Sequence, residues 1–174
     1  MFVIKVGLSV IIISLGIFMG RLMAKPYDNR VEHLQSILTA LMSLEAEMKY
    51  RLDPLAEIFS RVGSLTNGYT KNLFLKTSLA LKEWTFQDFS AVWANQVEET
   101  YQTSALTKKD IQIILDIGLD LGKTNMLGHE TMFARTYNML EQQIQEAKKE
   151  KDTKGKLCKT IGSVSGILIV ILVI

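Results

Sequence analysis

The sequence predicts an all-α protein: a cytoplasmic six-helix bundle flanked by N- and C-terminal transmembrane helices. Three observations lead to this prediction. Each end holds a long uncharged stretch, 6–20 and 160–174. Apolar residues in the middle recur at three- and four-residue spacing. No stretch between turns alternates apolar and polar residues as a half-buried strand does. The predicted domains are a membrane helix over 1–24, a helical domain over 25–156 and a second membrane helix over 157–174.

Composition narrows the possible functions. A chain of 174 residues has room for one soluble domain. Its formal charge of +2 is too small to indicate nucleic-acid binding. The single cysteine, Cys158, excludes an internal disulfide and a cysteine-based metal cluster. With His33 and His129 as the only histidines, little remains for imidazole catalysis or a His-rich metal site. We therefore expect no enzyme activity, cofactor or bound metal.

The first uncharged stretch, VGLSVIIISLGIFMG, lies between Lys5 and Arg21. Fifteen helical residues cover about 22 Å, whereas the hydrocarbon core of a bilayer measures about 30 Å. Snorkelling of the two flanking side chains extends the usable span to about residues 1–23. A cleaved signal peptide is the alternative interpretation, and it needs a small-residue cleavage site after the apolar run. Positive charge follows instead, which favours an uncleaved anchor.

The second span, LCKTIGSVSGILIVILVI, ends in residues that are apolar on every helix face, which favours a membrane helix over a buried core helix. Lysine and arginine near the spans set the orientation, and they cluster on the inner flanks: Arg21, Lys25, Arg30, Lys148, Lys149, Lys151, Lys154, Lys156 and Lys159. The middle should therefore face the cytoplasm, with both termini across the membrane. We expect lipid headgroups to contact Arg21, Lys25, Lys154, Lys156 and Lys159. Cys158 at the membrane edge is either palmitoylated or packed as a free thiol.

Each span contains two glycines at four-residue spacing, Gly16 with Gly20 and Gly162 with Gly166. This spacing places both glycines on one helix face, where another helix can approach closely. The predicted contact is either between the two spans or with partner subunits, including further copies of this chain.

Between the spans we predict helices over about 28–52, 53–63, 69–84, 89–101, 107–122 and 125–151. Pro26 and Pro54 indicate helix starts or breaks. Asp53 is the predicted cap of the second helix, and Gly63 its end. Thr107 and Asp110 resemble a capping box with Asp in place of Glu.

Three patterns in the sequence resemble functional motifs but do not match them. Gly118–Thr124 has three residues between its glycines where the Walker loop has four, and it follows a helix rather than a strand. His129-Glu130 begins the zinc-protease pattern HExxH, but Phe133 occupies the second histidine position. Glu45 and Glu47 diverge by about 200° on a helix and form no acid–base pair. Glu45 is instead a buried or interface charge with a partner such as arginine, or a charge at the edge of the apolar stripe.

Residues 38–59, LTALMSLEAEMKYRLDPLAEIF, resemble the signature of the stage III sporulation protein AB family. The resemblance is at Leu41, Leu44-Glu45, Glu47, Tyr50 and Pro54-Leu55. It continues through LDIGLDLG at 115–122, the long last helix and the lysine-rich run into a glycine-containing span. One departure follows Gly122, where 123–125 and His129 replace a small-residue-plus-acid pair and a glutamine of the relatives.

The resemblance implies a mother-cell membrane subunit of the channel-like complex between mother cell and forespore. It further implies a helical domain similar to those of the type II secretion platform protein, and a scaffold that joins a secretion-type ATPase to membrane subunits. Glu45, Glu47, Tyr50 and Pro54 are then candidate interface or structural positions. The alternative function is a small oligomeric transporter or pore. Against it, the polar side chains well inside the spans are serines, at 9, 14, 163 and 165.

Overall fold

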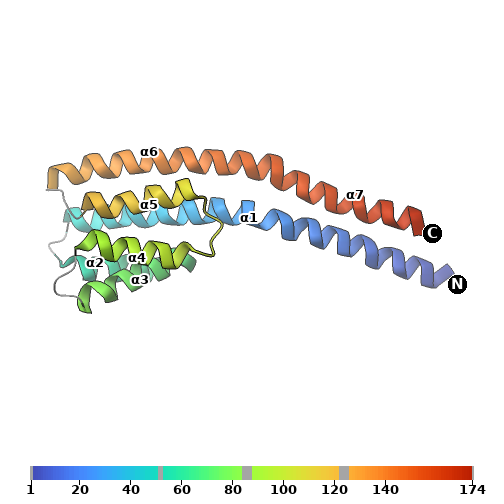
Figure 1. Ribbon diagram of the computed structural model, residues 1–174, viewed down its shortest axis with the longest axis horizontal. Coiled ribbons are helices and arrows are strands. Elements are labelled where there is room, and N and C mark those ends of the chain that lie inside the picture. The colour runs from blue at the N-terminus through green and yellow to red at the C-terminus, as the bar shows by residue number, and fades with distance from the viewer. Residues whose placement is uncertain (1, 51–52, 84–87, 122–125, 174) are drawn as a thin grey trace. The chain divides into compact units, whose positions relative to one another are not determined.

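The computed structural model describes residues 2–50, 53–83, 88–121 and 126–173. Of these, it describes the side chains of the residues between 7 and 171, except residues 126 and 127. The regular structure of these residues is helical throughout, so the predicted all-α fold is confirmed (Figure 1). In chain order the elements are α1 (Phe2–Tyr50), α2 (Leu55–Leu65), α3 (Gly68–Glu83), α4 (Phe89–Tyr101), α5 (Lys108–Leu121), α6 (Met126–Glu150), a π-helix (Lys151–Gly155) and α7 (Lys156–Val173).

The chain divides into two compact units. The end unit consists of residues 1–29 and 146–174, and the middle unit of residues 30–145. α1 contributes its first part to the end unit and its remainder to the middle unit.

Aromatic side chains from α2, α3 and α4 form one centre of the middle unit. Phe59 and Phe74 stack with ring centroids 5.1 Å apart, and Trp93 meets both rings edge-on. The Trp93 indole is fully buried and donates a hydrogen bond of 2.7 Å to the carbonyl of Ile114 on α5. Gly118, one turn further along α5, leaves the space that this indole fills, because a Cβ there would overlap with Trp93 Cδ1. A ring of this size thus fixes the spacing between α4 and α5.

The stripe predicted for the first helix of the middle is the buried face of α1. Of the predicted members, Leu34, Ile37, Leu41 and Leu44 are fully buried and Val31 is buried, whereas Leu38 and Met48 are half-buried and Leu52 lies outside the described residues. Leu140 and Ile144 on α6 and Ile114 and Ile117 on α5 are buried as well. The three- and four-residue spacing therefore predicted this core face correctly.

Two predicted helix boundaries are wrong. α1 continues through Pro26, because a proline removes one backbone hydrogen bond and α1 packs on both sides of that position, at Gly20 and at Leu34. α2 continues past Gly63 to Leu65. Gly63 lies inside the helix, where a Cβ would meet the Leu75 side chain of α3 at 2.9 Å. Close approach of α3, rather than helix termination, requires the glycine.

Of the two predicted helix caps, one is correct and one is wrong. The Thr107 capping box is confirmed, since Asp110 N–H donates to Thr107 Oγ1 at 3.2 Å and Thr107 N–H donates to Asp110 Oδ2 at 2.8 Å. The prediction for α2 is wrong, because Pro54 occupies the cap position. Asp53 binds Arg61 instead. The predicted stop at Gly122 lies outside the described residues.

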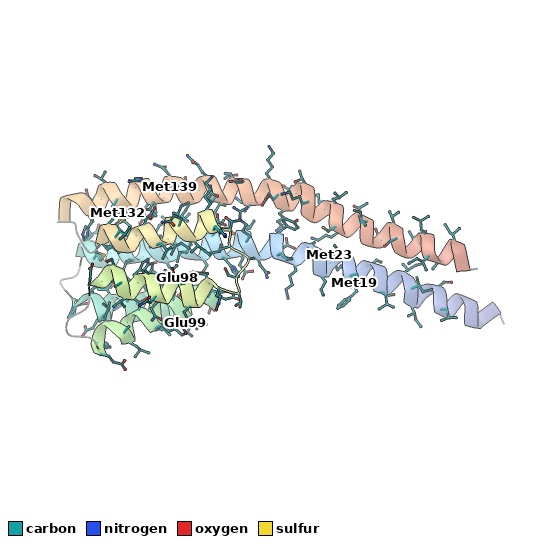
Figure 2. The ribbon with its side chains drawn as sticks, viewed as in Figure 1. Met19, Met23, Glu98, Glu99, Met132 and Met139 are labelled. Carbon is teal, nitrogen blue, oxygen red and sulfur yellow. The ribbon has the colours of Figure 1, made fainter. Side chains whose placement is uncertain are left out.

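The end unit exposes apolar side chains. Met19 and Met23 project from α1 (Figure 2), with exposed fractions of 58% and 62%. α1 is the one helix, among the described residues, whose length and apolar composition suffice to cross a membrane. The second span, over 157–174, stays a prediction.

Candidate functional site

The sequence signature of residues 45–54 lies at the end of α1 and the start of α2, in the middle unit. Glu47 and Asp53 bind the same guanidinium, since Arg61 Nη1 lies 2.6 Å from Glu47 Oε2 and Arg61 Nη2 lies 2.8 Å from Asp53 Oδ2. One arginine of α2 thereby ties the last turn of α1 to the segment that leads into α2. This geometry gives Glu47 a structural role in the turn.

Glu45 faces α6. Its Oε2 accepts a hydrogen bond of 2.7 Å from the Tyr137 hydroxyl, which also lies 3.2 Å from the Leu41 carbonyl. Burial raises the pKa of Tyr137, and the negative charge of Glu45 raises it further. The described partner of Glu45 is therefore a tyrosine, where the sequence suggested an arginine, and Glu45 is half-buried.

Beside this contact lies a pocket of about 330 Å³, lined by Glu45, Met48, Lys49, His129, Glu130 and Phe133. Its floor is apolar, because Met48 and Phe133 contribute their side chains to it. At its rim, Lys49 Nζ lies 2.8 Å from Glu130 Oε1, and both side chains are more than half exposed. A pocket with an apolar floor and a charged rim suits an apolar side chain of a partner protein.

Tyr50 and Pro54 are the two exposed members of this set of signature residues. Tyr50 is 82% exposed at the last residue of α1, and Pro54 is exposed ahead of α2. A large aromatic side chain with this exposure contributes little to the core and is typical of an interface residue. Signature residues 45 and 47 thus make contacts within the unit, whereas 50 and 54 remain available to a partner.

The described residues of the rejected catalytic motifs lie on helices. Gly118 is inside α5 against Trp93, and His129 and Glu130 are in the first turns of α6. Phe133 is buried in the core, so its position holds no ligand. Among the described residues, no group of three His, Cys, Asp or Glu side chains is placed to hold a metal ion. Residues 123–125, where the sequence departs from the pattern of the family, lie outside the described residues.

The glycines of the two predicted spans meet in the end unit. A Cβ at Gly16 would lie 2.5 Å from the Gly162 carbonyl oxygen, and one at Gly162 would lie 2.6 Å from Gly20 Cα. A Cβ at Gly166 would lie 3.2 Å from Ile13 Cα. Of the two contacts left open by the sequence, the structure has the one between α1 and α7.

The five predicted headgroup cations differ in their surroundings. Lys154 pairs with Glu150 at 2.6 Å and Lys156 with Asp152 at 3.3 Å, each one turn away on the same helical run. Lys159 Nζ lies 3.6 Å from Asp28 Oδ2. The other two, Arg21 and Lys25, are exposed on α1. The serine hydroxyls of 163 and 165 bond carbonyls of α7 itself.

Sequence reasoning missed the buried ion pair of the middle unit. It assigned Arg30 to the charges that flank the first span, but Arg30 is 5% exposed and binds Asp110 on α5 at 2.8 Å. Arg30 Nη2 also lies 3.4 Å from Gln143 Oε1 on α6. A signal was present, because Arg30 stands four residues before Leu34 on the apolar stripe.

Comparisons with known proteins agree with one another. A sequence model of the family described as stage III sporulation protein AB matches residues 5–174. Stage III sporulation protein AB of Bacillus subtilis (strain 168) is 23% identical over 164 residues, which cover 94% of this chain and 95% of the relative. A solved structure of a stage III sporulation protein AB has a TM-score of 0.67 at 20% identity. It covers 72% of this chain and 98% of the solved one, and it supports the fold.

Proposed function

The chain belongs to the stage III sporulation protein AB family, and from this membership we propose that it is a non-enzymatic membrane scaffold required for sporulation. In this role two spans anchor the chain in the mother-cell membrane around the forespore. The middle unit stays in the cytoplasm and both termini lie across the membrane. The scaffold holds a secretion-type ATPase against other membrane subunits of a channel-like complex.

The observation that supports this proposal most directly is the contrast between the two units. Large apolar side chains are exposed along both helices of the end unit, whereas the middle unit buries most of its apolar residues and exposes a few, such as Met42, Tyr50 and Leu65. An exposed apolar surface of this extent is stable in lipid rather than in water. In the sequence, lysine and arginine residues follow the first apolar stretch and precede the second, as expected for a cytoplasmic flank.

The pocket beside Glu45 is the proposed contact for a protein partner. Tyr50 lies next to it in the chain, at the end of α1, and supplies an exposed aromatic anchor. The Lys49–Glu130 pair gives the rim both signs of charge. Such a rim determines which partner binds, while the apolar floor contributes most of the affinity.

A matched pair of charge reversals tests this contact. Lys49→Glu replaces the rim pair with three neighbouring carboxylates, at 45, 49 and 130. Lys76→Glu breaks the Lys76–Glu99 pair between α3 and α4, which is also largely exposed and whose atoms lie 2.6 Å apart; Glu99 is labelled in Figure 2. Surface ion pairs of this kind contribute about 0–1 kcal/mol to stability, so both variants should fold.

The readouts are spore yield in a deletion strain complemented with each variant, and co-purification of the ATPase with the full-length protein. We expect the deletion to arrest development after engulfment, and Lys49→Glu to reproduce much of this defect and to lose the ATPase. Lys76→Glu should behave like the unaltered protein. Normal sporulation without the gene would refute the scaffold role, and equal ATPase recovery with both variants would refute the pocket as the contact.

A further inference from the structure

A groove runs beside α1 in the end unit. Its volume is about 640 Å³, and its lining combines one face of α1 with one residue of α7: Phe18, Arg21, Leu22, Lys25, Asp28 and Lys159. Each of these α1 residues lies three or four positions from another of them, so they share a helix face.

The lining changes character along the helix axis. Phe18 and Leu22, toward the N-terminal part of α1, are 59% and 54% exposed. Lys25 and Asp28 follow toward the middle unit. At 1.5 Å per residue, Phe18 and Lys25 are separated by about 10 Å along the axis. Along α1 the groove lining thus begins with the apolar Phe18, continues through the adjacent Arg21 and Leu22, and ends with the ionic Lys25 and Asp28, a sequence that matches the acyl chain and headgroup of a phospholipid.

Positive charge dominates the ionic end. Three cations, Arg21, Lys25 and Lys159, face one carboxylate, Asp28. Asp28 is itself neutralised, because Lys151 Nζ lies 2.9 Å from its Oδ1 and Lys159 Nζ 3.6 Å from its Oδ2. The hydrogen bond from Lys151 lowers the pKa of Asp28 despite its partial burial, so the carboxylate stays ionised and keeps Lys159 at the groove.

Arg21 and Lys25 form no ion pair with the residues that the structure describes. Their guanidinium and ammonium groups are thus free to bind an external anion, and arginine is suited to bind a phosphate through two parallel hydrogen bonds.

We propose that this groove is a binding site for one anionic phospholipid, with its phosphate at Arg21, Lys25 and Lys159 and an acyl chain along Phe18 and Leu22. The proposal rests on the membrane placement of the end unit in the proposed function. It assigns a defined lipid to a defined site, beyond the general attraction of basic residues to a membrane surface.

The apolar end selects this ligand over an acidic peptide. Phe18 lies between Gly16 and Gly20, which are the residues that hold α1 against α7. In the proposed orientation this level is inside the hydrocarbon region, which acyl chains occupy and acidic peptides do not enter.

The test uses full-length protein in detergent micelles, with lipid adducts counted by native mass spectrometry. The probe is phosphatidylglycerol, the zwitterionic comparison is phosphatidylcholine, and free glycerol phosphate serves as the headgroup without acyl chains. The groove variant is Arg21→Gln with Lys25→Gln. The control variant, Lys154→Gln with Lys156→Gln, removes the same number of positive charges from the π-helix and the start of α7, outside the groove lining.

We expect the unaltered protein to prefer phosphatidylglycerol to phosphatidylcholine at one high-affinity site. The groove variant should lose roughly tenfold or more of that affinity, since each juxtamembrane cation contributes on the order of 1 kcal/mol. The control variant should lose clearly less. Arg21→Lys with Lys25→Arg keeps both charges and should retain binding, which separates a charge effect from misfolding.

Equal losses in the groove and control variants would overturn the proposal in favour of diffuse surface attraction. Free glycerol phosphate binding as tightly as the lipid would replace the lipid site with a phosphate site. Alkaline carbonate extraction of cell membranes separates the two levels of the proposal. Protein that is released by carbonate refutes the membrane anchoring and the lipid site together, whereas anchored protein without lipid preference refutes the lipid site alone.

Discussion

Arg30 and Asp110, 80 residues apart in the chain, form a two-point ion pair inside the middle unit, with Nε–Oδ2 at 2.8 Å and Nη2–Oδ1 at 3.1 Å. Asp110 Oδ2 also accepts the Thr107 N–H that closes the capping box. Gln143 Oε1 on α6 lies 3.4 Å from the guanidinium. One carboxylate therefore joins α1 to the start of α5, and the guanidinium extends the contact to α6.

The substitution Asp110→Asn tests this link. An amide cannot neutralise the buried guanidinium, and breaking a buried pair by removing one partner costs about 3–5 kcal/mol. We expect a loss of this size in the free energy of unfolding, measured by chemical denaturation of full-length protein in detergent. Asp116→Asn on the same helix keeps an oxygen that can accept the hydrogen bond from Gln112 Nε2, and the free energy of unfolding should change by no more than about 0.5 kcal/mol. A similar result for both variants would show that the pair contributes nothing to stability.

Tyr101 makes the stability depend on alkaline pH. It is 1% exposed, and burial raises the pKa of its hydroxyl to about 12, although the bond with Thr70 opposes the shift. The unfolded chain ionises near pH 10. The raised pKa therefore contributes no penalty below pH 10 and destabilises the fold as pH rises from 10 toward 12.

Between pH 8 and pH 11, the unaltered protein should lose roughly 1 kcal/mol more free energy of unfolding than Tyr101→Phe, because phenylalanine has no hydroxyl to ionise. Other lysines and tyrosines titrate in both proteins, so the difference between the two isolates Tyr101. Parallel losses across this range would mean that the hydroxyl is solvated in the folded protein.

Local patterns made most of the fold predictable. An apolar stripe needs only a few turns of chain to reveal a buried face, which is why Leu34, Leu41 and Leu44 were assigned correctly. The capping box joins Thr107 to Asp110 three residues later and is likewise visible in sequence. Both signals lie within a single helix and depend little on the rest of the structure.

Predictions failed where distant residues decide the outcome. The hydrogen bond that Pro26 removes can be inferred from the sequence around it. The packing that keeps α1 continuous depends on residues far away in the chain. Gly63 looks like a helix end until Leu75 of the next helix is placed against it. For the candidate site, the sequence left open whether Glu45 has a partner such as an arginine or is a charge at the edge of the apolar stripe. Its hydrogen-bond partner in the structure, Tyr137, stands 92 residues away.

Glycine packing between α1 and α7 provides a final prediction. A Cβ at Gly162 would meet backbone atoms of Gly16 and Gly20 at 2.5–2.8 Å. Backbone cannot rotate away as a side chain does, so the two helices must separate. Gly162→Leu should therefore disrupt the pair, whereas Gly7→Leu adds the same side chain where nothing beyond the adjoining backbone of α1 lies within 4 Å of the Cβ and should leave it intact.

Double electron–electron resonance measures this separation between spin labels at Leu15 and Ile167, which are exposed on the two helices, in a background with Cys158→Ser. Gly162→Leu should lengthen and broaden the distance distribution of full-length protein in lipid nanodiscs, and Gly7→Leu should match the parent. An unchanged distribution in Gly162→Leu would mean that the glycines do not hold α1 against α7. The charged groove beside α1 would then have to be held by the Asp28 ion pairs with Lys151 and Lys159 instead.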